Sequence, residues 1–291
     1  MDCMMEKKYR VLSIGAHPDD ADTSAGGLLL KLRDKGWDVR LLSVTDGSAG
    51  MYDISRCGAP LAEIRRKEAA ASGKLLGGTY DVWDLPDARL TVNLENRERM
   101  IRYIREYRPD VIITNRPGDY HPDHRAAAIL VADASYLLMV PYICSDVPPL
   151  DYEPVILYWS DGFQTPYPSK ADVVVPIDGY EEQKVQLACC HECQYFDWMY
   201  WPDRMEKREW PREKQIEELR QRKTEAELRQ RDKRDSKTLR TTIQSEVSDI
   251  LNGNIESEVF CKTMVDSLTV FKDRHMELRL NYLPQVFRFA G

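Results

Sequence analysis

The sequence twice repeats one short pattern: an apolar run, a polar turn that contains His and Asp, and a helix of small and apolar residues. In the first copy, the apolar run 9–15 leads into the turn 16–20 and a helix expected over 26–35. In the second copy, the run 110–115 leads into the turn 116–125 and a further helix. Short apolar runs bounded by turn residues are typical of buried strands. The pattern therefore predicts two strand–turn–helix units.

The alternation of strands and helices continues through the first two thirds of the chain. Further strands are expected at 39–44, 80–85, 154–159 and 171–177, and further helices at 62–76, 94–107, 124–139 and 180–193. Gly36 stands where a glycine commonly closes a helix. Alternating elements of this kind predict an α/β fold, with a doubly wound, mostly parallel sheet and helices on both faces.

The two polar turns are the candidate functional site. In open parallel sheets, ligands bind in the crevice beyond the carboxyl ends of the strands. If the two strands are near neighbours, His17, Asp20 and His124 converge there on one cation. A His and two Asp within residues 17–20 would be costly to bury without such a task. Two imidazoles and one carboxylate form a common ligand set for hydrolytic zinc, which leaves a coordination position open for water.

The two neighbouring carboxylates, Asp19 and Asp20, are expected to divide two roles. A carboxylate that is bound to a metal is a poor proton acceptor, so a second one must take the proton from water. Asp20 is therefore the better ligand candidate and Asp19 the better general base. His121 and His124 divide in the same way, one binding the metal while the other faces the substrate. A zinc site at Cys189, Cys190, Cys193 and His191 is a weaker alternative, because no second Cys pair has matching spacing.

Composition narrows the class of protein. A hydrophobic share of 43% suffices for a real core, and a net charge of −7 argues against nucleic acid or an anionic membrane as the main partner. No apolar run approaches the roughly 20 residues that span a bilayer. The first eight residues lack the apolar stretch of a secretory signal. With seven cysteines, an odd number, these features predict a soluble, cytoplasmic protein with reduced thiols.

The last third of the chain differs in character, so we expect one domain over 1–200 and a charged, mainly helical extension over 201–291. Residues 213–240 are rich in charge and poor in apolar positions, which fits a solvated helix, a paired helix or a segment without fixed structure. Residues 245–275 regain sparse apolar positions and are expected to pack on the main domain or on another subunit of a homo-oligomer. His275 is expected on a helix surface.

A series of motifs carries a specific resemblance. In chain order they are Ala16-His17-Pro18-Asp19-Asp20 with Gly26-Gly27-Leu28, Thr45-Asp46-Gly47, Glu63-Ile64-Arg65-Arg66-Lys67-Glu68-Ala69, Leu85-Pro86-Asp87 and His121-Pro122-Asp123-His124. Over about residues 9–195 the chain resembles the zinc-dependent N-acetylglucosaminyl deacetylases, which include the phosphatidylinositol-glycan L and LmbE-like proteins. The resemblance implies a Rossmann-like fold, a zinc cofactor and a small-molecule amino-sugar conjugate as substrate. Iron or manganese would also suit a His/Asp/His set.

The resemblance also implies roles for individual residues. His17, Asp20 and His124 would hold zinc, Asp19 would be the general base, and His121 would sit by the carbonyl oxygen or pass a proton to the amine. Arg65 and Asp87 match positions that contact the sugar or its attached group, and Asp46 would stand behind the site. The alternative for Arg65 is a helix pair with Glu68, worth only ~0.2–0.5 kcal/mol.

The expected reaction is removal of the N-acetyl group from an N-acetylglucosamine-type sugar or glycoconjugate. Two alternatives stay open: an amidase acting on another acylated amine or thiol conjugate, and a metal-holding binding protein. The loops at 51–59, 160–170 and 195–210 are expected to decide the substrate. Their aromatic side chains can stack on sugar rings, although aromatic residues in loops more often only pack; they are Tyr52, Phe163, Tyr167, Trp198 and Trp201.

Overall fold

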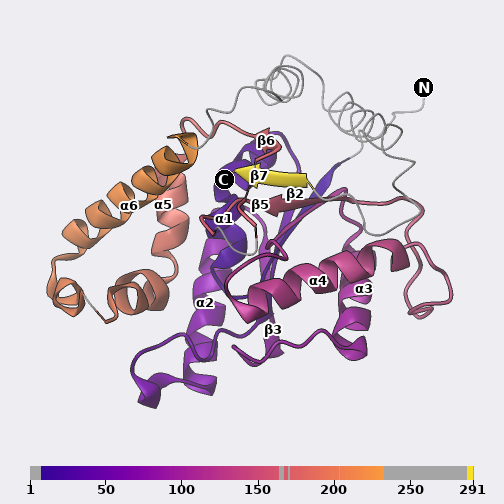
Figure 1. Cartoon of the computed structure of the whole chain (residues 1–291), viewed down its shortest axis with the longest axis horizontal. Coiled ribbons are helices and arrows are strands. Elements are labelled where there is room, and N and C mark those ends of the chain that lie inside the picture. The colour runs from indigo at the N-terminus through magenta and orange to yellow at the C-terminus, as the bar shows by residue number, and fades with distance from the viewer. Residues whose placement is uncertain (1–7, 164–166, 170, 203, 233–286, 291) are drawn as a thin grey trace.

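The computed structural model describes residues 8–163, 167–169, 171–202, 204–232 and 287–290. Its centre is one sheet of seven strands in the order β3-β2-β1-β4-β5-β7-β6, and every pair of neighbours is parallel (Figure 1). The order reverses between β1 and β4, as in a doubly wound sheet. The strands are β1 (Arg10–Gly15), β2 (Asp38–Thr45), β3 (Thr79–Leu85), β4 (Val111–Thr114), β5 (Val155–Trp159), β6 (Val173–Val174) and β7 (Phe287–Ala290).

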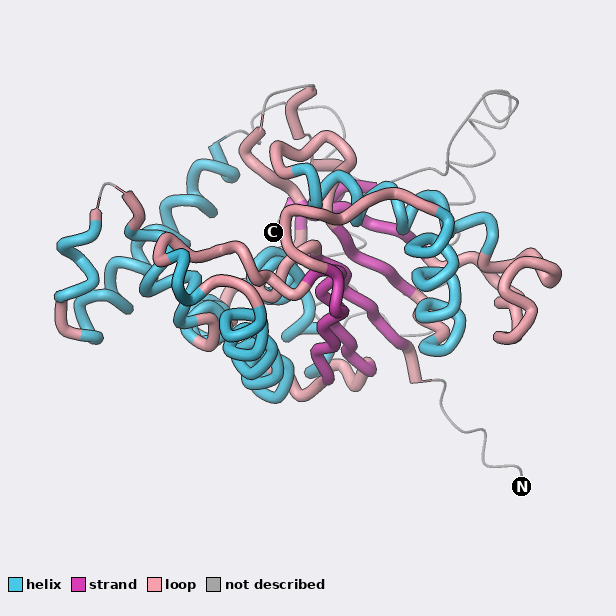
Figure 2. Tube along the Cα trace, turned by 90° about the horizontal axis from the view of Figure 1, so that it is seen from below, coloured by secondary structure: helices cyan, strands magenta, loops and turns pink. Residues whose placement is uncertain are grey.

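Helices lie on both sides of this sheet, as Figures 1 and 2 show. They are α1 (Asp20–Asp34), α2 (Ala59–Leu75), α3 (Leu94–Tyr107), α4 (Pro122–Leu137), α5 (Glu181–Cys189) and α6 (Arg212–Asp232). The predicted α/β fold with a doubly wound parallel sheet is confirmed. No helix within the described ranges combines the length and apolar character needed to cross a bilayer. The predictions for residues 245–275, His275 included, lie outside the described residues.

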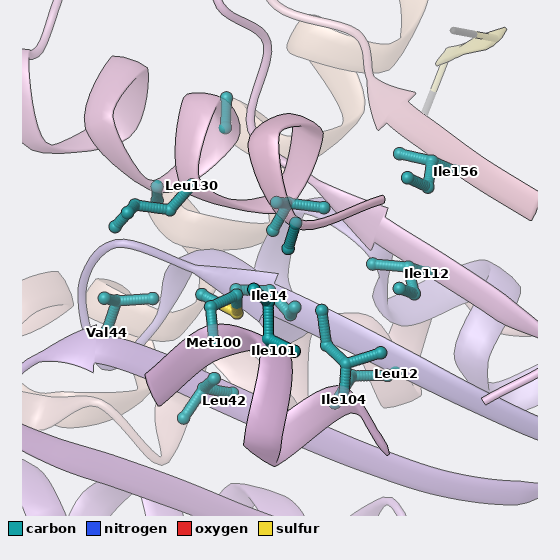
Figure 3. Close-up of a cluster of buried hydrophobic side chains, with 14 of the residues drawn as sticks. Leu12, Ile14, Leu42, Val44, Met100, Ile101, Ile104, Ile112, Leu130 and Ile156 are labelled. Carbon is teal, nitrogen blue, oxygen red and sulfur yellow. The ribbon is translucent and has the colours of Figure 1, made fainter. Parts of the chain in front are cut away.

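Alternation along the strands builds two separate cores. Val11 faces one side of the sheet, where it packs with α1, α2 and α5. Leu12 and Ile14 face the other side, where they pack with α3 and α4. The second core is drawn in Figure 3, with Met100, Ile101 and Ile104 of α3 against strand residues. Because successive side chains of a strand point to opposite faces, a sheet buried on both faces reads as a continuous apolar run.

Several predicted boundaries were wrong, and one has a clear cause. Helix α1 begins at Asp20, six residues before the predicted start at Gly26. Gly26 and Gly27 were taken to open the helix, but they lie in its interior. A Cβ on Gly26 would come within 2.9 Å of Leu187, and one on Gly27 within 2.5 Å of Ile177. These glycines therefore let neighbouring segments pack closely against α1. Strand β6 is also much shorter than the predicted 171–177.

Helix α6 is paired rather than fully solvated. Gln215 and Leu219 on α6 are buried, and Leu219 packs with Ala188 of α5 and with Tyr195 and Phe196. Figure 1 shows α5 and α6 running side by side. Of the three alternatives for the charged segment, the described part of α6 fits the paired helix.

A single buried arginine organises the turn that follows α4. Arg105 on α3 is 2% exposed, and its guanidinium donates hydrogen bonds to six backbone carbonyls. Two of these, on Leu137 and Leu138, belong to the end of α4, where carbonyls lack helical partners. The others belong to Val140, Ile143, Cys144 and Val147.

We expect Arg105→Met to lower the free energy of unfolding by about 3 kcal/mol or more, because six hydrogen bonds from the buried guanidinium are lost and each contributes ~0.5–1.5 kcal/mol. Chemical denaturation of the purified protein measures this. The matched control is Arg102→Met on the same helix, where solvent-screened ion pairs with Glu98 and Asp146 should contribute little to stability. Equal losses in the two variants would contradict the assignment.

Candidate active site

The turn after β1 is unusually tight, and glycine makes it so. A Cβ on Gly15 would come within 2.5 Å of the Asp20 Cβ and 2.9 Å of the Ala21 nitrogen. The chain therefore reverses at once into α1, with Asp19 as the residue that caps it. The backbone N–H of His17 donates to Asp20 Oδ2 at 2.9 Å and holds that carboxylate beside the imidazole. The Asp19 side chain makes no hydrogen bond to the helix end and is left for another partner.

The turn after β4 presents the second group of ligands. His121 caps α4, and its Nδ1 accepts a hydrogen bond from the backbone N–H of Asp123 at 3.2 Å. Asp119 Oδ1 accepts from the backbone N–H of His121 at 3.0 Å. Since β1 and β4 are adjacent and parallel, with Ile14 opposite Thr114, both turns leave the sheet at the same edge. This adjacency brings residues about a hundred positions apart into contact.

Three side-chain atoms that could bind a metal meet at this edge. His17 Nδ1 lies 3.2 Å from His124 Nε2 and 3.5 Å from Asp20 Oδ2, and the last two atoms are 3.3 Å apart. Ligands in a tetrahedral zinc site, at ~2.0–2.2 Å from the ion, are separated by about 3.4 Å. The three atoms thus have the mutual spacing of ligands that share one ion.

The other nitrogen of each imidazole faces a carboxylate. His17 Nε2 lies 3.1 Å from Asp87 Oδ1 and 3.5 Å from Asp123 Oδ2, and His124 Nδ1 lies 3.0 Å from Asp119 Oδ1. The contacts are close, although their angles fall outside those of a well-aligned hydrogen bond. Metal-binding histidines are commonly oriented in this way by a carboxylate on the far nitrogen. The carboxylates at the far nitrogens are therefore a second feature, independent of the ligand spacing, that fits a metal centre.

The electrostatics of the site favour a cation. Burial alone would lower the pKa of His17, but Asp123, Asp20 and Asp87 outweigh it and raise that pKa well above its usual value. The pKa of Asp20 is lowered, because His124 and His17 outweigh the effect of burial. The pKa of Asp87 falls to about 2, since His17 and Arg65 also outweigh burial there. Carboxylates crowded around imidazoles in this way suit a divalent ion.

Asp19 has a different environment from its neighbour Asp20. Its Oδ1 accepts a hydrogen bond from Arg65 Nη2 at 2.9 Å. Burial raises the pKa of Asp19, and the positive charge of Arg65 opposes this rise. Arg65 is only 2% exposed, and it also donates to the carbonyls of Pro18 and Gly47. Gly47 has φ +67°, and a Cβ there would meet the guanidinium at 2.7 Å, so this position suits glycine.

The remaining predicted residues also lie close by. His121 lies beside His17, with ring centroids 4.7 Å apart, and burial and the two neighbouring imidazoles lower its pKa. His17, His121 and His124 also form a group whose ligand atoms lie within 4.8 Å of one another, as do His17, Asp87 and Asp123. Asp46 Oδ1 accepts from the backbone N–H groups of Ser48 and Asp87, so it orders the loop that carries Asp87.

The sequence analysis gave roles only to the histidines of the second turn and missed two carboxylates that lie beside the predicted ligands. Asp123 accepts from the backbone N–H groups of Ala88 and Leu90 and so ties the loop after β3 to α4. Asp119 faces His124. Both lie within two residues of a histidine in the segment 119–124. This closeness in sequence could have pointed to them.

The weaker zinc alternative around residue 190 does not form a ligand cluster in the part of the chain that is described. His191 is fully buried and pairs with Asp22, with its Nε2 2.6 Å from the carboxylate. Cys193 contacts Glu68 instead, through its backbone N–H at 2.9 Å and its thiol at 2.8 Å. These side chains are held by separate carboxylates.

Comparison with known proteins agrees with the fold. Residues 12–135 match the family model of PIG-L, GlcNAc-PI de-N-acetylase. Diacetylchitobiose deacetylase of Thermococcus kodakarensis is 31% identical over 203 residues, 66% of this chain and 73% of that one. The structure of N,N′-diacetylchitobiose deacetylase from Pyrococcus horikoshii aligns with a TM-score of 0.58 at 29% identity, over 66% of this chain and 73% of that chain. Mycothiol S-conjugate amidase of Streptomyces coelicolor is 26% identical over 56% of this chain and 64% of that one.

The fold and site define an α/β protein of the deacetylase type. The chain belongs to the PIG-L/LmbE-like family of GlcNAc deacetylases.

We expect Asp119→Ala to weaken metal binding about 10–100-fold, because the variant removes the carboxylate that faces the far nitrogen of His124. Competition with a chelating dye measures the affinity. Asp133→Ala is the matched control, because Asp133 lies on α4 and makes a partly exposed contact with Arg97, 3.7 Å away. An unchanged affinity in Asp119→Ala would show that this carboxylate does not orient a ligand.

Proposed function

We propose that this protein is a metal-dependent hydrolase that removes the N-acetyl group from an N-acetylglucosamine-type sugar or glycoconjugate. One observation carries the proposal: three donor atoms lie 3.2–3.5 Å apart, while the carboxylate next to them in sequence is held by Arg65. We propose His17, Asp20 and His124 as the ligands and zinc as the ion, with iron or manganese also compatible with this set. A bound ion would supply Lewis acidity and activate water for attack on the amide carbonyl.

Asp19 is the proposed general base. It accepts a proton as water adds to the carbonyl carbon, and a tetrahedral oxyanion results. Its raised pKa suits the task, because a base works best when its pKa approaches the working pH. The C–N bond then breaks, and the amine leaves with a proton from Asp19 or His121. The products are acetate and a free amino sugar, which balances the addition of one water.

His121 is proposed to stabilise the oxyanion or to protonate the amine. Its Nδ1 accepts a backbone hydrogen bond, so Nδ1 carries no proton. In the neutral imidazole the proton is then on Nε2, which becomes the donor. The lowered pKa favours this neutral form at physiological pH. A fixed donor next to the reacting carbonyl is the arrangement that stabilises developing negative charge.

Arg65 and Asp87 are proposed to serve the substrate. The family resemblance implies that both contact the sugar or its attached group. Since Arg65 is almost fully buried behind Asp19, we propose that it acts on the substrate mainly by positioning that carboxylate. Asp87 lies beside His17, and its other oxygen accepts from the backbone N–H of Ala49 at 3.1 Å.

Two other functions remain as alternatives. An amidase acting on another acylated amine or thiol conjugate would use the same residues, and the similarity to an S-conjugate amidase supports it. A metal-holding binding protein is disfavoured, because binding alone needs neither Asp19 nor His121. We further propose a cytoplasmic protein without a nucleic-acid partner, in keeping with the net charge of −7. We also propose that residues 1–200 form one domain and residues 201–291 an extension. The protein would assemble as a homo-oligomer through this extension.

The deciding experiment separates the ligands from the base. We expect His17→Ala to lose the metal and Asp19→Asn to retain it while losing most turnover, about 100-fold or more. Elemental analysis measures the metal, and acetate release from N-acetylglucosamine conjugates measures turnover. Asp133→Asn, away from the site, should change neither. Equal metal loss in His17→Ala and Asp19→Asn would contradict the assignment of roles, and metal-loaded wild type without acetate release would contradict the deacetylase itself.

Arg65 should control the pH dependence. Its positive charge opposes the rise in the pKa of Asp19, so Arg65→Met should raise that pKa further. A base with a higher pKa stays protonated to higher pH, and the acidic limb of kcat/KM should move up by about one pH unit or more. Arg65→Lys keeps the charge and should move the limb less. A limb that stays in place in Arg65→Met would exclude Asp19 as the titrating base.

A further inference from the structure

Asp19 is one of the residues that line a cavity next to the candidate site. The volume of this cavity is about 650 Å³, within the range of small-molecule sites. The far wall comes from α6, outside the segment 12–135 that matches the family model. The lining residues are Asp19, Gln194, Tyr195, Trp198, Met199, Trp201, Pro202, Leu219, Arg222 and Lys223.

Aromatic and apolar side chains form most of the lining, and neighbours hold several of them in place. The Trp201 ring stacks on Tyr52, with centroids 5.5 Å apart and an interplanar angle of 12°, and remains 49% exposed. Tyr195 is buried in the small core that includes Leu219. Flat aromatic surfaces that are held in position suit stacking against another ring.

The wall formed by α6 also carries positive charge. Glu218 Oε1 accepts hydrogen bonds from both Lys207 Nζ and Arg222 Nη2, each at 2.6 Å, so one carboxylate serves two cations. Lys223 donates to the hydroxyl of Tyr195 at 3.1 Å and lines the same wall. Among the described residues that line the cavity, Arg222 and Lys223 are cationic, and Asp19 is the one carboxylate. A ligand at Asp19 therefore has two cationic side chains within the same cavity.

We infer that this cavity binds the group attached to the acetamido sugar, and that the preferred group is a flat ring bearing an anionic substituent. The inference rests on the proposed function. In a 2-acetamido sugar, the anomeric substituent is on the carbon next to the one that bears the amide. With the amide at Asp19, that substituent is within reach of the cavity. The ring would stack on Trp198 or Trp201, and its anion would face Arg222 and Lys223.

Three substrates test the inference on the metal-loaded, full-length enzyme: N-acetylglucosamine, its 4-nitrophenyl glycoside and its 4-carboxyphenyl glycoside. We expect KM to fall about tenfold when the neutral ring is added, because stacking and burial contribute. The carboxylate should lower KM a further three- to tenfold or so, since it faces cations. The advantage of the carboxylate should shrink at high salt, because screening weakens the attraction.

Variants assign the two contributions to residues. Trp198→Ala and Trp201→Ala are both made. At least one of them should remove most of the advantage of the ring, and the matching Phe variant should retain it, which separates stacking from a folding defect. Arg222→Gln should remove the advantage of the carboxylate and leave that of the ring. Tyr142→Ala, at an exposed tyrosine in the turn after α4, is the control and should change neither. Thermal melting of each variant confirms that it is folded.

The outcomes separate this inference from the proposed function. If acetate is released from all three compounds with equal KM, the inference is overturned and the deacetylase stands. If none releases acetate, the deacetylase is contradicted. Calorimetry with the same compounds then measures their binding affinities and so tests the cavity separately. Affinity for the carboxyphenyl glycoside no higher than for the free sugar overturns the inference in that case too.

Discussion

The parallel pairing of β1 with β4 is the constraint on which the site depends. Ile14 lies opposite Thr114, so the turns that follow leave the sheet together. A connection between adjacent parallel strands needs a long crossover, and here two other strands and their helices separate β1 from β4 in the sequence. Slipping this pair by one residue would turn buried side chains to the opposite face. The packing of both cores therefore fixes the register of β1 and β4, and with it the relative positions of the three donor atoms.

Hydrogen bonds to backbone N–H groups link a third loop to this pair. Asp123 at the start of α4 holds Ala88 and Leu90, and Asp46 after β2 holds Asp87. Carboxylates that accept from the backbone are fixed in direction. Asp123 and Asp87 lie close to His17, where their charge would be costly without compensation. Much of the negative charge around the imidazoles is thus part of the local structure as well as of the cation site.

The sequence predicted the sheet, the helices and the converging turns well, because each depends on a local pattern. The periodicity of 9–15 and 110–115 and the position of His17, Asp20 and His124 at strand ends are of this kind. The start of α1 was missed, because Gly26 and Gly27 are explained only by the packing of Leu187 and Ile177, which are distant in sequence. The part of the cavity wall that α6 forms also could not be predicted from the sequence. The burial of Leu219 depends on α5, and the charged composition of α6 conceals it.

Asp19 and Asp20 show how two neighbouring residues of one type acquire different chemistry. The start of α1 falls between them, so Asp19 caps the helix and Asp20 belongs to its first turn. Asp20 consequently faces the imidazoles, whose charge lowers its pKa, whereas Asp19 faces Arg65 and the cavity, where burial raises its pKa. A helix start six residues later, as the glycines had suggested, would not separate the two side chains in this way. The close turn at Gly15 therefore gives the two neighbouring carboxylates the different partners that their proposed roles require.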